Sequence, residues 1–369
     1  MTKKNKKIDI VLLVLVAILA LGGLFIFTSA SFGLLARKGF SLTDLLFDQV
    51  VLGLMLGCVV LVGALYTPLK LIRKYAIHIF IISIFLTLLV FVPGVGFEHG
   101  GAKRWISIFG TTSFQPSEAL KLGVVIYFAA LLPLFKDRIR TVKYALGLTG
   151  IVIVLPAIIL LREPDTGTLA VLFAALCAIL LASGTKIRYF FFLIVISILA
   201  VGTLALVKPY VRERVLTFLD PSRDPQGASY QIQKSLIAIG SGGITGRGFG
   251  QSIQKFGSLP EPTGDSIFAV AGEEFGFIGG SLIILLFLLF GVRGIQIAYR
   301  TPDMFSGLLA VGIVILIVSQ SFANVASMLG LIPLTGVPLV FVSHGGTALL
   351  FAFLEIGLLL NISKTSQQK

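Results

Sequence analysis

The sequence is poor in charged residues, cysteine and histidine. Only 13% of its 369 residues are charged, and it contains 2 cysteines and 3 histidines. Soluble domains carry about 25% charged residues to cover their surface, so an ordinary soluble enzyme is excluded. Both cysteines, Cys58 and Cys177, lie within apolar segments, a position that indicates neither a disulfide nor a metal site.

Apolar residues are correspondingly abundant: 56% of the chain is hydrophobic and the mean hydropathy is +1.00. About 20 apolar residues form one helical crossing of a bilayer. The predicted fold is therefore an all-α polytopic membrane protein with ten transmembrane helices in one membrane domain, residues 1–369. The predicted crossings are residues 8–29, 46–66, 75–92, 118–135, 144–161, 166–183, 189–207, 266–290, 304–328 and 347–361.

Basic residues set the predicted orientation. The 30 Lys and Arg outnumber the 17 Asp and Glu, for a formal charge of +13. With both termini cytoplasmic, most bases of the short connections fall inside, and the short outer connections hold only Arg37, Lys38, Lys103, Arg104 and Arg162. This distribution follows the positive-inside rule, so the charge indicates orientation and not a nucleic-acid partner. The first apolar run exceeds the length of a signal-peptide core, which favours an uncleaved crossing.

Acidic residues are distributed in the opposite way. The inner connections hold only Asp137 and Asp303, whereas the other connecting carboxylates lie on or near the outer side, including one long connection at 208–265. A connection of that length is too long to be a simple link between packed helices. The functional site is therefore expected on the outer face.

The segment 100–121 contains the single tryptophan, Trp105, and an ionisable pair. Pro116 can start the following helix, which puts Glu118 and Lys121 three residues apart on one helix face. Such a pair near a membrane is costly unless it lines a wet cavity. Two interpretations stay open: a substrate cavity, or a structural ion pair with Trp105 as an interfacial anchor.

The tight connection 162–167 contains Pro164 and Gly167, which suit a sharp turn, and Asp165, which can cap the next helix. Capping alone would explain Asp165. A role in the site is the alternative.

The long outer connection contains a glycine run at 240–250. It lacks the strand–helix context and the Gly-Lys-Ser/Thr ending of a nucleotide-binding loop. Backbone amides freed by glycine can still contact a diphosphate, with Arg247 or Lys255 adding charge. The connection ends in Asp265, directly before the eighth predicted crossing.

The last outer connection, 330–346, is rich in proline and glycine and largely apolar. Such irregular backbone is tolerated at membrane depth where it lines a cavity. His344 is a candidate for binding substrate or metal, but the other histidines, His78 and His99, do not complete a metal cluster. No metal ligand is therefore predicted.

These motifs together resemble the SEDS family (shape, elongation, division and sporulation), the membrane glycosyltransferases FtsW and RodA that polymerise peptidoglycan from lipid II. The resemblance covers essentially the whole chain. The stretch from Gly250 to Glu261 is closer to the FtsW branch, whereas Thr263 and His344 replace a histidine and a tyrosine common in the family. The matching segments are 103–106 (KRWI), 115–121 (QPSEALK), 163–167 (EPDTG), 259–274 (LPEPTGDSIFAVAGEE) and 338–346 (PLVFVSHGG).

The resemblance implies an inverting peptidoglycan glycosyltransferase with Asp265 as the catalytic carboxylate. A base for the acceptor hydroxyl and cations for the departing diphosphate are what this reaction requires. No cofactor is required by the pattern; a divalent cation such as Mg²⁺ or Mn²⁺ is a candidate helper. The expected substrate-binding residues are Lys103, Arg104, Trp105, Glu118, Lys121, Asp165, Arg247, Lys255, Glu261, Glu274, Ser343 and His344.

The resemblance also implies partners and a location. The expected partners are lipid II, a class B penicillin-binding protein and other membrane proteins of the division machinery. The expected location is the bacterial cytoplasmic membrane, at the division septum. A lipid II flippase or another polyprenyl-lipid transporter is the competing function, although no repeat relates the two halves of the sequence. A structural scaffold is the third, and it would not need Asp265.

Overall fold

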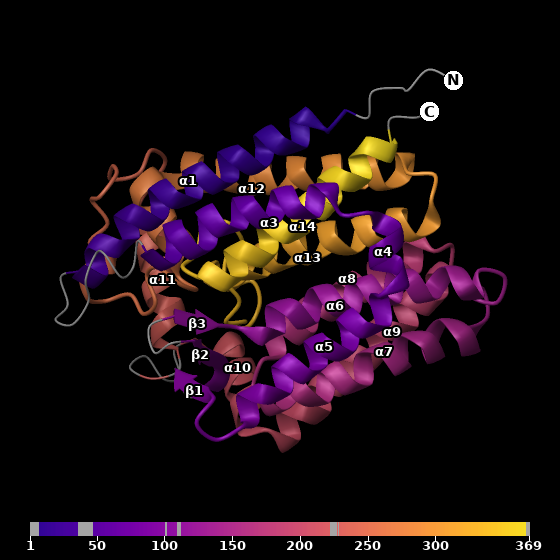
Figure 1. The fold of residues 1–369 in the computed structure, drawn as a ribbon. Coiled ribbons are helices and arrows are strands. Elements are labelled where there is room, and N and C mark those ends of the chain that lie inside the picture. Colours follow the sequence, from indigo (N-terminus) through magenta and orange to yellow (C-terminus); the bar gives the residue numbers. More distant parts are fainter. Residues whose placement is uncertain are drawn as a thin grey trace.

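Long apolar helices make up most of the computed structural model, which describes residues 7–35, 47–99, 102–108, 112–221, 227 and 229–366 (Figure 1). In chain order these elements are α1 (Ile10–Leu35), the π-helical segment η1 (Phe47–Met55) with α3 (Leu56–Tyr66), α4 (Leu69–Lys74), α5 (Ala76–Leu88) with η2 (Leu89–Phe91), α6 (Pro116–Leu131) with η3 (Leu132–Phe135), α7 (Val142–Arg162), α8 (Thr166–Ala182), α9 (Ile187–Val207), α10 (Pro209–Leu219), α11 (Tyr230–Ser241), η4 (Gln254–Phe256), α12 (Ile267–Arg300), α13 (Met304–Met328) and α14 (Gly346–Ser366).

Every predicted crossing corresponds to a helix. Among the described residues, 8 helices are long and apolar enough to cross a membrane, and the apolar helices Ala76–Phe91 and Thr166–Ala182 are shorter. The largest boundary difference is in α12, which continues to Arg300 where the prediction ended at 290. Arg293 does not end this helix because it pairs with Asp9, with 2.8 Å between Nη2 and Oδ2. Arginine is itself a good helix former, so this residue can continue the helix.

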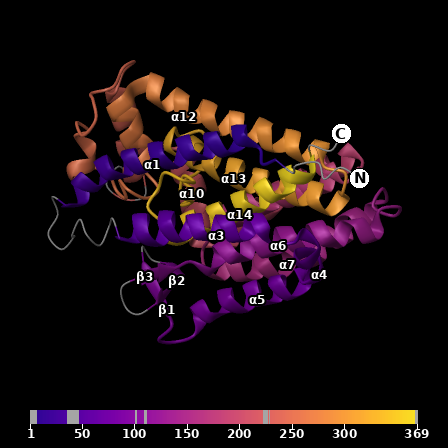
Figure 2. The ribbon, with the colours of Figure 1, turned by 45° about the horizontal axis from the view of Figure 1, so that its top comes forward.

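The bundle has a clear centre and periphery. In α6 and α13, 67% of the most apolar 18-residue stretch is buried inside the bundle, whereas in α9 only 6% of the corresponding stretch is buried. α13 packs against α12, α8, α6 and α14, while α5 packs mainly against α6 and α14 mainly against α3. Figure 2 shows α12 and α1 along one side of the bundle and α5 along the other. α9 is therefore the outermost of these helices, and α13 is the scaffold on which the site-bearing segments rest.

At one end of the bundle, α14 is joined to the residue that precedes α1 and to α3. The backbone amide of Asp9 donates to Ser363 Oγ (3.1 Å), and Lys364 Nζ donates to the carbonyl of Leu65 (2.8 Å). The opposite end holds the sheet, the 163–165 turn and α11 (Figure 1). We call this opposite end the Asp265 end.

A small antiparallel sheet at the Asp265 end was not predicted. It is formed by β1 (Gly96–His99), β2 (Ala102–Ile108) and β3 (Thr112–Phe114), in the order β1-β2-β3. Phe97 pairs with Trp105 in the register, and their rings lie 6.2 Å apart. The strands are short, and their alternation of polar and apolar residues is too brief to give a strong signal. β2 of this sheet contains Arg104.

The described part of the predicted connection 208–265 contains helices. α10 and α11 form most of its described part, and the short segment η4 precedes Asp265. α11 packs against the start of α12, where Gln231 Nε2 donates to Ser266 Oγ (3.1 Å). This packing ties the connection to the segment that holds Asp265.

α12 is broken at Gly276, whose φ of 64° and ψ of −161° are non-helical. The glycine run supplies hydrogen-bond partners for backbone groups on both sides of the break. Phe277 N donates to the carbonyl of Gly243 (2.9 Å), and Gly248 N donates to that of Glu274 (2.9 Å). A Cβ at Gly246 would lie 2.1 Å from the oxygen of Glu274. These glycines therefore allow the two backbones to come close, and amides of the glycine run donate their hydrogen bonds to carbonyls of α12.

Candidate active site

Asp265 lies two residues before α12, where charged side chains from several segments meet. β2 contributes Arg104, the turn between α7 and α8 contributes Asp165, and α10 contributes Arg214. The charges of these three residues and of Glu261 all act on the Asp265 carboxylate. The site is therefore assembled from four parts of the chain that are distant in sequence.

The backbone around Asp265 is fixed by α13 and by the connection before α14. Asn324 Nδ2 donates to the carbonyls of both Asp265 (2.8 Å) and Val337 (2.9 Å). Ser343 Oγ donates to the carbonyl of Gly264 (2.8 Å), and the amide of His344 donates to that of Thr263 (2.6 Å). Ser343 and His344 thus hold the loop before Asp265 through its backbone carbonyls.

Gly336 faces the charged groups directly and has a φ of +68°. A Cβ on this residue would lie 3.5 Å from Arg214 Nη2, 3.7 Å from Asp265 Oδ2 and 3.8 Å from Arg104 Nη1. One point in space therefore lies within 4 Å of two guanidinium nitrogens and one carboxylate oxygen. Glycine leaves that point free.

The two arginines are held by backbone carbonyls and a hydroxyl. Arg104 Nε donates to the carbonyl of Glu163 (3.1 Å) and its Nη2 donates to that of Pro164. Arg214 Nη1 donates to Thr166 Oγ1 and to the carbonyl of Thr335, each at 3.2 Å. Because these partners are neutral, both guanidinium groups keep their charge available to an anion.

The Asp265 side chain is partly buried, and its carboxylate makes no hydrogen bond with the described residues. Its pKa is raised from 3.8 to about 6, first by burial and then by the negative charge of Glu261. Arg104 and Arg214 act in the opposite direction. A carboxylate with this pKa is ionised at neutral pH and is a stronger base than an ordinary aspartate.

Asp165 caps α8, as predicted. Its Oδ1 accepts from the amide of Thr168 (3.1 Å) and its Oδ2 from the Thr168 hydroxyl (2.8 Å). The same carboxylate acts on Arg214 and Asp265. Capping and site electrostatics are both served by this residue.

Glu118 and Lys121 form the predicted pair on α6, with 2.9 Å between Oε2 and Nζ. Both are buried, and Lys121 Nζ also donates to Gln320 Oε1 on α13. Glu355 of α14 completes a cavity of about 10 Å³ between these groups, which is room for a single water molecule. This pair therefore lies inside the bundle, in a cavity too small for a sugar.

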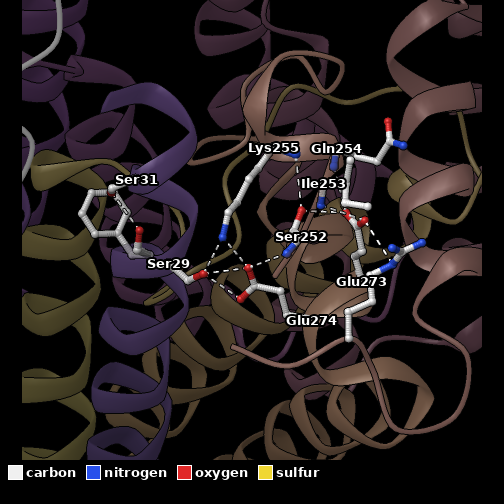
Figure 3. A network of polar contacts seen from close by, with 10 residues as sticks. Ser29, Ser31, Ser252, Ile253, Gln254, Lys255, Glu273 and Glu274 are labelled. Atoms are coloured by element: carbon white, nitrogen blue, oxygen red, sulfur yellow. Dashed lines mark hydrogen bonds and ion pairs between the residues drawn. The ribbon is translucent and has the colours of Figure 1, made fainter. Parts of the chain in front are cut away.

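Lys255 lies in a different cluster, shown in Figure 3. Its Nζ is 2.6 Å from Glu274 Oε1 and donates to Ser29 Oγ (2.9 Å), and both charged side chains are 0% exposed. Ser29 in turn donates to Glu274 (2.7 Å). The cluster joins α1 and α12 to the segment containing η4, so Lys255 and Glu274 are enclosed and bound to each other.

The neighbouring Glu273 is also fully paired. It accepts from Ser252 Oγ (2.6 Å) and from the amide of Ile253 (3.0 Å), and Arg247 Nε lies 3.5 Å from its Oε1. Arg247 is exposed. The two cations expected to meet a diphosphate are therefore engaged with carboxylates of α12.

Of the remaining predicted residues, Lys103, Trp105 and Glu261 lie nearer the surface, whereas His344 Nε2 is buried. Lys103 is exposed on β2, and Glu261 is exposed in the loop before Asp265 with a φ of +45°. Trp105 is partly buried beside Phe97. The imidazole of His344 stacks on Phe27 at 5.6 Å, and burial lowers its pKa.

The sequence analysis did not select Arg214, Gly336 or Asn324. Arg214 lies in an amphipathic segment with other bases. The sequence does not distinguish it from Arg212, and only the structure shows that Arg212 is exposed and Arg214 is partly buried. Asn324 and Gln320 are polar residues within an otherwise apolar helix, α13. That interruption is a usable signal, because polar groups inside membrane helices are expensive and usually functional.

Among the described residues, no group of three or more His, Cys, Asp and Glu side chains is placed to hold a metal ion.

An apolar groove of about 270 Å³ runs beside α12, between its glycine-rich face and the end of α11. Phe268, Gly272, Gly276 and Gly280 line it from α12, and Ile239 lines it from α11. Phe268 follows Asp265 by three residues, so the groove starts close to the charged site along the chain.

Residues 9–368 match the family model of FtsW, RodA and SpoVE, described as cell cycle protein. The stage V sporulation protein E of Bacillus subtilis (strain 168) is 36% identical over 367 residues, covering 100% of both chains. A probable peptidoglycan glycosyltransferase FtsW of Geobacter sp. (strain M18) is 35% identical, covering 96% of each.

Two solved structures share the fold. One, described as "Structural coordination of polymerization and crosslinking by a peptidoglycan synthase complex", has a TM-score of 0.78 and 28% identity and covers 98% of this chain and 99% of that chain. The crystal structure of the rod shape determining protein RodA of Thermus thermophilus has a TM-score of 0.70 and 25% identity and covers 98% of each chain.

Proposed function

The chain belongs to the FtsW, RodA and SpoVE family, the SEDS family, and from this membership we propose that it is a peptidoglycan glycosyltransferase that polymerises lipid II. One observation supports this most directly. The carboxylate of Asp265 and the guanidinium groups of Arg104 and Arg214 surround one free position above Gly336. A base and two cations around one position are what transfer from a sugar diphosphate requires.

In the proposed reaction, Asp265 accepts the proton of the acceptor sugar hydroxyl while the hydroxyl oxygen attacks the anomeric carbon of the donor. The bond to the diphosphate breaks on the opposite side, so the configuration inverts. Arg104 and Arg214 stabilise the negative charge that the leaving diphosphate gains. A single base is sufficient for this direct displacement, in contrast to hydrolysis by two carboxylates.

We assign the other predicted residues to supporting roles. Asp165, Ser343 and His344 hold segments of the site through capping and backbone contacts. Arg247, Lys255 and Glu274 hold the glycine run and η4 on α12. Lys103 and Glu261, which are exposed, and the partly buried Trp105 are proposed to contact the bulky lipid-linked substrate at the rim.

The proposed topology is ten crossings with both termini in the cytoplasm. It puts the Asp265 end, with its sheet and its connection 208–265, at the outer face of the bacterial cytoplasmic membrane. The 8 long apolar helices and the 2 shorter ones supply the ten segments. The groove beside α12 is the proposed place of a polyprenyl tail, because its lining is apolar and it starts near the site.

A class B penicillin-binding protein is the proposed partner. The similarity to a structure described as a peptidoglycan synthase complex supports an assembly with another protein. The many exposed apolar side chains on α5, α7 and α9 leave wide faces for lipid or for the membrane helix of such a partner.

Reconstitution tests the activity and separates it from transport. The purified protein with its cognate class B penicillin-binding protein would be placed in vesicles containing labelled lipid II, and polymer would be followed by gel. We expect polymer from the wild type and none from Asp265→Asn, with Glu213→Gln, an exposed change on α10, as the control. Movement of lipid II across the bilayer without polymer would favour a flippase, and neither activity would favour a scaffold.

The finer proposal is septal synthesis during cell division. The probable FtsW relatives support it, while the similarity to a stage V sporulation protein makes sporulation the competing role. A tagged protein in growing cells should concentrate at the septum, and its depletion should block division. Even labelling of the side wall, or a defect confined to spores, would contradict the septal proposal.

A further inference from the structure

Glu163, the residue after α7, has an unusual environment. Its side chain is 1% exposed, and neither carboxyl oxygen has a hydrogen-bond partner among the described residues. An ionised carboxylate without partners is among the costliest groups to bury. A protonated carboxyl carries no charge and costs much less, so the environment favours the neutral acid.

The charged groups around Glu163 point in the same direction. Burial is the main cause that raises its pKa from 4.5 to about 8, and the negative charge of Asp165 adds to it. Arg104 lowers it but does not reverse the effect. Beyond these, Arg214 and Tyr210 of α10 act on the same group of charges.

Arg104 is closely associated with Glu163 but does not bind its carboxyl group. The guanidinium donates to the backbone carbonyls of Glu163 and Pro164, and its Nη1 points toward the free position at Gly336. If Glu163 were ionised, its carboxylate would compete for this guanidinium. It would also add a second negative charge beside that of Asp165, close to the arginine that is proposed to bind the diphosphate.

We propose that Glu163 is a positioning residue that works as a neutral acid: by staying protonated it leaves the charge of Arg104 free for the diphosphate of the substrate. This rests on the proposed function, in which Arg104 meets that diphosphate. Glu163 does not touch the reacting atoms. It sets the charge of the site.

The first experiment measures binding instead of turnover. The affinity for undecaprenyl diphosphate would be measured between pH 6.5 and 9.5 for the wild type, Glu163→Gln and the exposed control Glu213→Gln. In the wild type and the control, Kd should rise about tenfold above pH 8, because one new negative charge forms near the ligand. In Glu163→Gln, where the substituted amide cannot ionise, Kd should not show this rise above pH 8 and should match the wild type at pH 7.

A second measurement detects the proton itself. Infrared difference spectra of Glu163→Gln against wild type at pH 7 should show the loss of one protonated-carboxyl C=O band, and Glu213→Gln should not. Loss of a carboxylate band instead would overturn the proposal, even if Glu163→Gln folds poorly. Identical pH profiles for wild type and Glu163→Gln, or a tenfold loss of affinity in Glu163→Gln at pH 7, would also overturn it.

The two proposals fail in distinguishable ways. If the protein made no polymer but the pH dependence of binding differed between wild type and Glu163→Gln, the glycosyltransferase proposal would fail and the role of Glu163 would stand. If the protein made polymer but wild type and Glu163→Gln showed the same pH dependence of binding, the role of Glu163 would fail and the glycosyltransferase proposal would stand.

Discussion

Two clusters of charged residues lie near the start of α12, and they differ in how their charges are paired. Around Glu273 and Glu274, every carboxylate meets a cation, a hydroxyl or an amide, and Lys255 is fully enclosed. Around Asp265, the carboxylate makes no hydrogen bond with the described residues, and two guanidinium groups face a free position.

The difference indicates which charges serve folding and which serve chemistry. A charge that is completely paired in the folded state has nothing left to offer a substrate. Charges held in place by neutral backbone groups, as Arg104 and Arg214 are, remain available. The comparison predicts that changes at the Asp265 cluster alter the rate, whereas changes at the Lys255 cluster alter stability.

After the complete loss expected for Asp265→Asn, the next largest effect on rate is expected from Arg214→Ala. Removing one cation from the leaving group should lower kcat/KM about a hundredfold or more, with little change in thermal stability. Arg212→Ala is the matched control, because Arg212 is an exposed arginine on the same helix. Equal rates for the two variants in the polymerisation assay would remove Arg214 from the site.

Gly336→Ala should have a smaller effect. The new methyl group would occupy the position between Asp265, Arg104 and Arg214, displacing the substrate and lowering kcat/KM by about ten- to a hundredfold. Gly330→Ala is the control for backbone strain, since Gly330 has nearly the same φ, +69°, but faces Ile232. If both variants lost the same activity, strain alone would explain the loss.

Acid should then inactivate the enzyme gradually. Asp265 must be ionised to act as a base and has a pKa of about 6, so kcat/KM should be constant near neutral pH and fall about tenfold per unit well below pH 6. Thermal stability measured at each pH separates this from unfolding. A rate that stays constant down to pH 4.5 would exclude Asp265 as the base.

The smallest effect on rate, and a large one on stability, is expected from Lys255→Met. The change leaves Glu274 buried without its cation and should lower the unfolding free energy by about 3–5 kcal/mol. The double variant Lys255→Met/Glu274→Gln should recover much of this loss in a thermal denaturation series. Activity per folded molecule should stay near wild type. If Lys255→Met were stable but inactive, the prediction would be wrong and Lys255 would be assigned to the active site.

The parts of the fold that depend on local pattern were predictable. Apolar runs gave the crossing segments, and local spacing gave the Asp165 cap and the Glu118–Lys121 pair, because these interactions span only three residues. The sheet was not predicted, since its strands are short and stabilised by pairing with each other. The length of α12 was underestimated because Arg293 finds its partner at Asp9, far away in the sequence.

The site was predictable only in part for a related reason. Asp265 was selected through the family resemblance, whereas Arg214 and Gly336 join it only when α10 and the connection after α13 come together in space. Lys255 was expected to face substrate because a lysine beside a glycine run suits an anion. Its partner Glu274 lies 19 residues later, and nothing local in the sequence distinguishes an enclosed lysine from a free one.

The break at Gly276 couples two stretches of backbone that are far apart along the chain. Phe277 and Ile278 donate their amide protons to Gly243 and Ile244, so these protons can exchange with solvent only when the glycine run lifts away. The helix and the glycine run must therefore open as one cooperative unit. Any local unfolding that begins in the connection 208–265 reaches the interior of α12 through this contact.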